Sequence, residues 1–347
     1  MKRKLIAVDM YSGCGAVTEG LKSFFNVVAA IDNDPVAASS YCANHPSVHF
    51  FEQEISGLSP DAVKAVIKEN QIDLLVVCAP CQPFSSQNSG KGMDDRVSLI
   101  LQSIRFAAVL KPRLIFFENV SGLMTSRHSE VLSQLRTGLL DLGFSNWYGP
   151  IKINAADYGV PQRRQRFIMM AAQDDVSPPD IPLPTTPENH RIHVSDVISD
   201  LQRLQSGEAS STDPLHFARN HRSIALQRFK LIPQNGGSRS ALPQRLELEC
   251  HKHHNGHPDV YGRMSLDEVA PTLTSGCTDA TRGRFVHPTD DRSITLREAA
   301  RLQTFPDSYK FDGSPQSIAR QIGNAVPIEF VKILGKVMNS CLLAEGQ

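Results

Sequence analysis

A cysteine held between two prolines, in Pro80-Cys81-Gln82-Pro83, is the residue best placed for nucleophilic chemistry. It follows the apolar run 74–78, typical of a buried strand, so it should lie at the mouth of a sheet. The thiolate is the attacking form of cysteine and needs a partly exposed, electropositive setting. We expect the commoner role, a small side chain in the interior, for five others: Cys14, Cys42, Cys78, Cys277 and Cys341.

A carboxyl group, Glu118, ends the apolar stretch Phe116-Phe117 and precedes Asn119-Val120. Partial removal from water should raise its pKa and let it hold a proton. That property suits a general acid. The alternative is an ordinary loop carboxylate or a helix N-cap.

A glycine-rich turn, Tyr11-Ser12-Gly13-Cys14-Gly15, comes directly after the apolar run 5–9. Glycines let the backbone approach a ligand closely. Asp32, at the end of the next apolar run, could accept hydrogen bonds from ribose hydroxyls. Thr18 occupies the third glycine position of the dinucleotide fingerprint, which favours a nucleoside without a pyrophosphate over NAD. The alternative is a tight strand-to-helix turn without a ligand.

A row of polar side chains, Gln162-Arg163-Arg164-Gln165-Arg166, leads into the apolar run 167–171. In an extended segment, residues two apart share a face, so Gln162, Arg164 and Arg166 should point together. Guanidinium groups in a row can hold phosphates or a carboxylate. The alternative is a solvated edge strand.

The elements that must position these residues alternate between strand and helix. Strands are predicted at 5–9, 27–31, 74–78, 114–117 and 167–171, and helices at 35–44, 97–110, 295–302 and 327–343. Alternation of this kind predicts a mostly parallel sheet, whose ligands bind beyond the carboxyl ends of the strands. The Gly-rich turn, Asp32, residues 80–85 and Glu118-Asn119 should therefore converge on one cleft.

The second half has a different texture. Five prolines between 178 and 187 indicate a linker, and the stretch up to about residue 261 looks irregular. Residues 172–213 carry two basic and eight acidic side chains, whereas residues 214–262 carry seven basic and three acidic ones and six histidines. A basic face is therefore expected locally, although the 36 Lys and Arg balance the 36 Asp and Glu over the whole chain.

The composition excludes several classes of protein. Hydrophobic residues make up 41% of the 347 residues, as in ordinary globular proteins, and no run of about 18 apolar residues predicts a membrane span. Seven cysteines without a disulfide framework favour a reducing, intracellular setting. The length predicts one large domain and a smaller one.

Taken together, these blocks resemble the cytosine-C5 DNA methyltransferase family over nearly the whole chain, in the bacterial restriction-modification form. The matching blocks come in the family's order: 11–15, 31–34, 80–82, 118–120, 162–166, 263 with 270–274, 297–303 and 321–327. The resemblance implies an α/β fold with a Rossmann-like, S-adenosylmethionine-binding parallel sheet and a smaller, irregular target-recognition domain. It implies a catalytic domain at 1–178, completed by 316–347, and a recognition domain at 179–315.

The resemblance also implies roles by matching position. Cys81 would be the nucleophile and Glu118 the acid, with Arg164 and Arg166 as further catalytic residues. S-adenosylmethionine (AdoMet) would contact Tyr11, Gly13, Gly15, Asp32, Glu54, Pro80 and Asn324. DNA would contact Gln82, Ser85, Arg96, Arg219, Arg222, Arg228, Arg239 and Arg245. The sequence departs from the family pattern at Ala16, usually glycine, and at Glu54, usually aspartate.

The implied reaction methylates carbon 5 of a cytosine flipped out of duplex DNA, through a bond between Cys81 and carbon 6, and leaves S-adenosylhomocysteine. No metal is expected. The enzyme would act as a monomer in a bacterial or phage-encoded, cytoplasmic setting. A restriction endonuclease for the same DNA site would be its partner without a stable complex.

Three other functions compete with DNA methylation as an explanation of these blocks. A methyltransferase for cytosine in transfer RNA would carry the same blocks, but the long variable region favours DNA. A catalytically inactive DNA-binding regulator should have lost Cys81, Glu118 or Asn324, and the sequence keeps all three. An NAD-dependent oxidoreductase has no use for the Pro-Cys-Gln block. The His-rich run 250–257 lacks the second ligand pair of a usual zinc site and is better explained as a turn near DNA.

Overall fold

The computed structural model describes residues 4–68, 71–80, 99–125, 128–248 and 259–344. The chain forms two compact units. The first unit holds residues 1–155, 165–185 and 328–347, and the second holds 156–164 and 186–327. Residues 156–164 and 316–327, which the sequence assigned to the catalytic domain, thus lie in the second unit.

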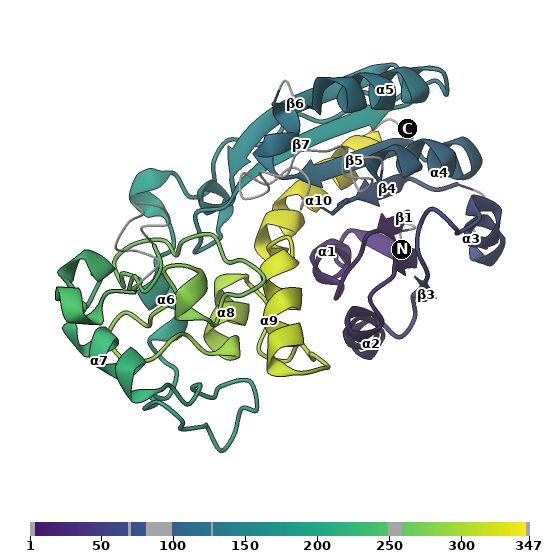
Figure 1. The fold of residues 1–347 in the computed structure, drawn as a ribbon. Coiled ribbons are helices and arrows are strands. Elements are labelled where there is room, and N and C mark those ends of the chain that lie inside the picture. Colours follow the sequence, from purple (N-terminus) through teal and green to yellow (C-terminus); the bar gives the residue numbers. More distant parts are fainter. Residues whose placement is uncertain (1–3, 69–70, 81–98, 126–127, 249–258, 345–347) are drawn as a thin grey trace. The chain divides into compact units, whose positions relative to one another are not determined.

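Seven strands in the described part of the first unit form one sheet, in the order β3-β2-β1-β4-β5-β7-β6 (Figure 1). The strands are β1 Leu5–Met10, β2 Phe25–Asp32, β3 His49–Glu52, β4 Leu74–Val77, β5 Leu114–Asn119, β6 Asn146–Asn154 and β7 Gln165–Ala172. The first five are parallel, whereas β7 runs antiparallel to both β5 and β6. The expected α/β class with a mostly parallel sheet is confirmed.

Helices connect these strands, and the local signals for their starts are partly visible in the sequence. The helices of this unit are α1 Ala16–Leu21, α2 Pro35–Asn44, α3 Pro60–Val66, α4 Gln102–Leu110, α5 Ser129–Leu140 and α10 Ile328–Ala344. Asp34 caps α2 as expected, because its Oδ1 accepts from the amides of Val36 and Ala37 at 3.1 and 3.4 Å. Of the helix expected at 97–110, the structure describes an α-helix from Gln102 after a 3-10 turn at 99–101, and residues 97 and 98 lie outside the described residues.

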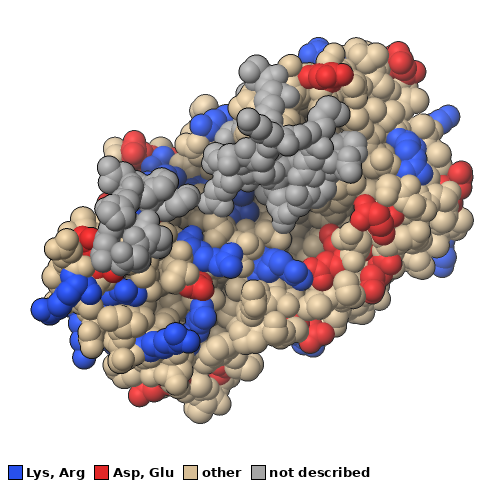
Figure 2. Space-filling model, viewed as in Figure 1, with Lys and Arg blue, Asp and Glu red and all other residues tan. Residues whose placement is uncertain are grey.

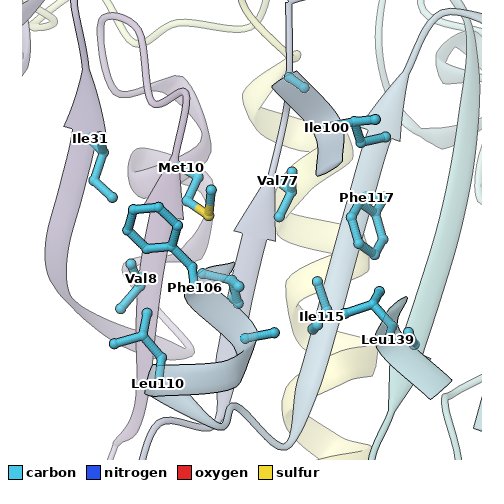
Figure 3. Close-up of a cluster of buried hydrophobic side chains, with 14 of the residues drawn as sticks. Val8, Met10, Ile31, Val77, Ile100, Phe106, Leu110, Ile115, Phe117 and Leu139 are labelled. Carbon is cyan, nitrogen blue, oxygen red and sulfur yellow. The ribbon is translucent and has the colours of Figure 1, made fainter. Parts of the chain in front are cut away.

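One face of the sheet is covered by α3, α4 and α5. Phe106 and Leu110 of α4 lie over Val8 and Met10 of β1 (Figure 3). Leu139 of α5 lies by Ile115 of β5 in the same cluster. Burial of such side chains is worth about 1.5–3 kcal/mol each, so this layer fixes the strands whose ends carry the candidate site.

The opposite face is covered by α10, seen behind the strands in Figure 3. Here α1 packs closely on α10, since a Cβ at Gly20 would lie 2.6 Å from the Cβ of Val331. On the other helix, a Cβ at Gly335 would lie 2.9 Å from Cδ2 of Leu21. The C-terminal helix is therefore an integral layer of the first unit and supports the Gly-rich turn through α1.

The second unit has little regular structure, and buried arginines tie its loops together beside apolar clusters. Its α-helices among the described residues are α6 Val194–Ile198, α7 Ser223–Leu231, α8 Leu296–Leu302 and α9 Pro315–Asn324. Arg263, 1% exposed, donates to the carbonyls of Ile232, His287, Asp290 and Phe229 and pairs with Asp291. The helix α7 lies inside the stretch that the sequence indicated as irregular.

A second buried arginine, Arg292, bonds both carboxylate oxygens of Glu298, at 2.8 and 2.9 Å. It also donates to Asp290 at 3.1 Å. Glu298 in turn completes a capping box with Thr295 at the start of α8. Within the residues that the structure describes, no helix has the length and apolar character needed to cross a membrane.

Candidate active site

The Gly-rich turn after β1 has the open backbone that its composition predicts. Tyr11, Gly13 and Gly15 all have positive φ, at 62°, 52° and 95°. The amide of Ser12 donates to the carbonyl of Ile31 at 3.1 Å, which ties the turn to the end of β2. A Cβ built on Gly13 would meet nothing within 4 Å. The turn therefore presents unobstructed backbone at the carboxyl end of the sheet.

Tyr11, Gly13 and Asp32, which were predicted to bind the cofactor, lie together at this turn. Asp32 accepts from the amides of Gly13 and Asp34, at 2.8 and 3.0 Å, and burial raises the pKa of its carboxyl against the effect of these bonds. Burial also raises the pKa of Tyr11, with further contributions from the negative charges of Glu54 and Asp32. The carboxylates of Asp32 and Glu54 accept hydrogen bonds and carry negative charge, so the site fits a nucleoside with hydroxyl and amine donors better than a pyrophosphate.

Asp9, beneath the turn, was not singled out by sequence. Its side chain is fully buried, and its Oδ2 accepts from the hydroxyl of Thr18 at 2.9 Å. Its Oδ1 has no hydrogen-bond partner among the described residues. Burial raises the pKa of this carboxyl from 3.8 to about 7, so Asp9 is partly protonated near neutral pH.

The end of β5 carries a buried ion pair. Oε1 of Glu118 lies 2.8 Å from Nε of Arg166 on β7, and the two side chains are 8% and 10% exposed. The antiparallel pairing of β5 with β7 places Glu118 opposite Ile168, two residues along from Arg166. The pair lies at the carboxyl end of the parallel strands, where a ligand is expected.

The neighbouring strand β4 leads toward the predicted nucleophile. Nδ2 of Asn119 donates to the carbonyl of Ala79 at 3.1 Å, and the amide of Cys78 donates to Met10 at 3.4 Å. The segment that ends at Pro80 is thus fixed between β1 and β5. The predicted residues Cys81, Gln82, Ser85 and Arg96 lie outside the described residues.

The other described cysteines differ in exposure. Burial raises the pKa of the Cys14 and Cys277 thiols to about 12, which makes them poor nucleophiles. Burial also raises the pKa of Cys78 well above its usual range. An interior position was expected for Cys42, and this is wrong. Cys42 is exposed because it lies on the solvent side of α2.

The polar row at 162–166 divides between the two units. Arg166 pairs with Glu118 in the first unit, whereas Gln162 and Arg164 are buried in the second. Arg164 donates to the carbonyls of Leu273, Gly323 and Ala325, at 3.0, 3.2 and 2.8 Å. Its guanidinium is therefore occupied by backbone carbonyls.

Gln303 completes this arrangement and was missed as a single residue, although its sequence block was noted. Its Nε2 donates to the carbonyls of Ile322 and Ala325, at 2.6 and 3.2 Å, and its Oε1 accepts from Gln162 at 3.0 Å. We call Gln162, Arg164 and Gln303 the carbonyl clamp, because together they hold the last turn of α9, which ends at Asn324. A Cβ on Gly323 would lie 2.0 Å from the carbonyl oxygen of Thr274, so only glycine fits there.

The candidate DNA-binding arginines fall into different environments. Arg228 is engaged internally, because it donates to the carbonyl of Leu246 at 2.8 Å and lies 5.2 Å from the ring centre of Tyr261. Arg222 and Arg245 are exposed, Arg239 is half-buried, and Arg219 pairs with Asp279. Figure 2 shows Lys and Arg side chains gathered on the visible face of the second unit, with acidic side chains among them.

No group of metal-ligating side chains occurs among the described residues. The His-rich run 250–257 lies outside them.

Replacing Asp9 with asparagine tests its buried charge. The folded state holds a proton on Asp9 up to about pH 7, whereas an unfolded chain loses it near pH 4. Stability is therefore lost as the pH rises from about 4 through 7. Asp9→Asn should unfold with a higher free energy than the wild type at pH 8, by up to about 4 kcal/mol, and lose that advantage at pH 4. Urea unfolding at both pH values measures this difference, and Asp175→Asn, which changes an exposed carboxylate, is the control. A lower free energy of unfolding for Asp9→Asn than for the wild type at pH 8 contradicts the assignment.

Replacing Gln303 tests the carbonyl clamp. Gln303→Leu removes one hydrogen-bond partner each from the side-chain amide of Gln162 and from the carbonyls of Ile322 and Ala325, so the free energy of unfolding should fall by about 1–3 kcal/mol. The matched control is Gln234→Leu, because Gln234 is exposed and also donates to one carbonyl, that of Thr289, at 3.0 Å. Equal losses in the two variants, measured by urea unfolding, would refute a special role for the clamp.

Solved structures share this fold. A prophage-encoded E. coli protein named as a DNA modification methyltransferase superposes with a TM-score of 0.77 at 22% identity, covering 98% of this chain and all of the other. The Dnmt2 methyltransferase of S. pombe superposes with a TM-score of 0.62 at 18% identity, covering 99% and 100%. At such low identity these likenesses establish the fold alone.

Sequence similarity goes further. A family model described as C-5 cytosine-specific DNA methylase matches residues 5–340. The chain is 38% identical over 337 residues to the Type II methylase M.HgiDII of Herpetosiphon aurantiacus, covering 95% of this chain and 93% of the relative. It is 30% identical to the Type II methyltransferase M.XorII of Xanthomonas oryzae, covering 95% and 83%. The chain therefore belongs to the family of C-5 cytosine-specific DNA methylases, enzymes that methylate carbon 5 of cytosine in DNA.

Proposed function

We propose that the chain methylates carbon 5 of a cytosine flipped out of a specific duplex DNA sequence, with Cys81 as the covalent nucleophile. The observation that carries the proposal is the buried pair of Glu118 and Arg166, 2.8 Å apart at the end of β5. The adjacent strand β4 leads through the anchored Ala79-Pro80 to residue 81. A proton donor, a cation and a thiol would then meet at one edge of the sheet.

The chemistry follows from the low nucleophilicity of carbon 5. Addition of the Cys81 thiolate to carbon 6 breaks the aromatic system, while Glu118 delivers a proton to ring nitrogen 3 and so neutralises the charge that the addition creates. Carbon 5 then has enamine character and can form a bond to a methyl group. Loss of the carbon 5 proton to water, departure of Cys81 as thiolate and return of the nitrogen 3 proton to Glu118 restore the aromatic ring of the 5-methylcytosine product. Arg166 keeps Glu118 in place through their ion pair.

AdoMet, when bound, supplies an electrophilic methyl group on a sulfonium. We assign its binding to Tyr11, Gly13, Gly15, Asp32, Glu54, Pro80 and Asn324. The open backbone at Gly13 and the acceptors of Asp32 and Glu54 suit the donors of a nucleoside. We assign Arg164 a supporting role, since its guanidinium is occupied by the carbonyls that flank Asn324.

Residues 179–315 would form the target-recognition domain, and 1–178 with 316–347 the catalytic domain. A base inside a stacked duplex is out of reach for both Cys81 and Glu118, so the target must leave the helix. Among the predicted contacts, Arg219, Arg222 and Arg245 are exposed and available to DNA. Arg228 would act through the packing of Tyr261 instead.

The cellular context proposed is restriction-modification in a bacterial cytoplasm. The relatives M.HgiDII and M.XorII carry Type II names. A restriction endonuclease for the same DNA word would then share the target without forming a stable complex with this chain.

The covalent step can be tested with duplex DNA that carries 5-fluorocytosine at the target position. Fluorine cannot leave as a proton does, so the wild-type chain with AdoMet should form an adduct that survives denaturing electrophoresis. Cys81→Ala should form no adduct and transfer no methyl group, while still binding AdoMet. Cys42→Ala, which removes an exposed thiol on α2, serves as the control and should react normally. An adduct with Cys81→Ala would end the assignment.

The proton donor can be tested with Glu118→Gln, which keeps the shape of the side chain but holds no acidic proton. Single-turnover methyl transfer should slow by about 10²–10⁴-fold. AdoMet affinity should stay within about twofold. The control Asp141→Asn changes an exposed carboxylate at the end of α5 and should leave the rate unchanged. A near-normal rate for Glu118→Gln would remove its role as acid.

A further inference from the structure

A pocket of about 450 Å³ opens on the second unit and is lined in part by Arg219, one of the predicted DNA contacts. Its floor is apolar and includes Leu296 and Ala319, and its rim carries Arg219, Asp279 and Arg282. The volume is in the range of small-ligand sites. Two guanidiniums and one carboxylate give the rim a net positive charge, so the pocket is suited to an electron-rich partner.

Arg219 is held in a defined orientation. Its Nη1 lies 3.3 Å from Oδ2 of Asp279 and 3.5 Å from the carbonyl of Thr278. Its own carbonyl accepts from the amide of Gly207 at 3.2 Å and the hydroxyl of Ser206 at 3.1 Å. The side chain nevertheless stays 51% exposed. Because both of these contacts fall on Nη1, they leave the Nε and Nη2 donors of this pocket-lining side chain to other partners.

Asp279 is itself fixed and charged. Its Oδ1 accepts from the amide and the hydroxyl of Thr281, at 2.9 and 2.8 Å. Partial burial favours the neutral acid, but the bonds from Thr281 and the charge of Arg219 outweigh it and lower the pKa. The carboxylate therefore braces Arg219 throughout the physiological pH range.

Arg282, on the same rim, differs from Arg219 in its contacts. It is exposed, and among the described residues no hydrogen bond or ion pair to its guanidinium occurs. Its stem lies over Gly276, where a Cβ would come within 2.1 Å of its Cδ. The guanidinium is thus carried to the rim by packing and is not opposed by a carboxylate.

We propose that this pocket contacts the DNA substrate, with Arg219 reading a guanine edge under the orienting influence of Asp279, and Arg282 binding a backbone phosphate. A rigid donor fork suits a base edge, because two parallel bonds require a fixed orientation. The carboxylate 3.3 Å from Arg219 offsets the attraction of Arg219 for a phosphate, whereas Arg282 has no ion pair among the described residues. The inference rests on the proposed DNA methylation and names Asp279 and Arg282, which no sequence pattern indicated, as part of recognition.

The experiment begins with bisulfite sequencing of plasmid DNA from cells that express the wild-type chain, which gives the methylated word. Methylation kcat/KM is then measured on that duplex and on duplexes with single base-pair changes, for Arg219→Ala, Asp279→Asn and Arg282→Ala. DNA affinity is measured over a range of salt concentrations. The conservative Arg219→Lys keeps the charge but loses the fork, so it separates orientation from charge.

Arg219→Ala and Arg219→Lys should both lose discrimination at one guanine position, by roughly 5- to 150-fold in the ratio of kcat/KM values. Asp279→Asn retains the acceptor for Thr281 and should lose part of the same discrimination at the same position. Arg282→Ala should weaken binding to all duplexes alike and reduce the salt slope of log K by about one.

Uniform weakening by the Arg219 variants, or unchanged binding by all four, would overturn the inference while wild-type methylation still stands. If Arg219→Lys discriminates between the duplexes as well as the wild type does, the base-reading role of Arg219 is wrong. Absence of methylated cytosine in the wild-type plasmid would instead refute the proposed function itself.

Discussion

The pair of Glu118 and Arg166 is the interaction on which the candidate site depends. Two charges removed from water are tolerated only when they compensate each other, and removal of either leaves the other uncompensated at a cost of about 3–5 kcal/mol. The partners come from β5 and β7, which are adjacent only because β7 enters the sheet antiparallel beside β5. The reversed strand at this end of the sheet thus supplies the cation for a carboxyl group that the parallel strands place.

Around that pair, the parallel strands gather the remaining groups by a simple rule. Strands β2, β1, β4 and β5 are neighbours and end at the same edge, so short segments after each strand meet there. The bonds from Ser12 to Ile31, Cys78 to Met10 and Asn119 to Ala79 fasten these segments to one another. Since the layers α3–α5 and α10 enclose the sheet, the edge is the part of the first unit left free for ligands.

The sequence predicted the features that depend on local signals. Asp34 with Pro35 marked the start of α2, and apolar runs marked β1, β2, β4, β5 and β7 within a few residues. The helix α9 was not predicted, although Ser314 and Pro315 mark its start as Asp34 and Pro35 mark that of α2. The helix α5 and the strands β3 and β6 were not predicted either; β3, for example, spans four residues that are at most half-buried. Local patterns cannot define such elements, because they form by packing against distant segments.

The same limit applies to side-chain roles. Arg164 and Arg166 are two residues apart and looked equivalent, yet one binds three backbone carbonyls and the other a carboxylate. Gln303 has partners around residues 162 and 322, more than a hundred residues apart, so only the fold reveals the carbonyl clamp. Likewise, the raised pKa of Asp9 is a consequence of burial that no spacing encodes.

Arg263 and Arg292 tie the loops of the second unit to one another through main-chain carbonyls and neighbouring carboxylates, beside an apolar cluster that includes Phe229. A carbonyl is present whatever the side chain, so bonds of this kind place few demands on the identity of the residues they fasten. Loops anchored in this way can exchange their outward-facing side chains, or change length between anchor points, while the interior stays the same. Such a scaffold separates the stability of the second unit from the chemistry of its surface.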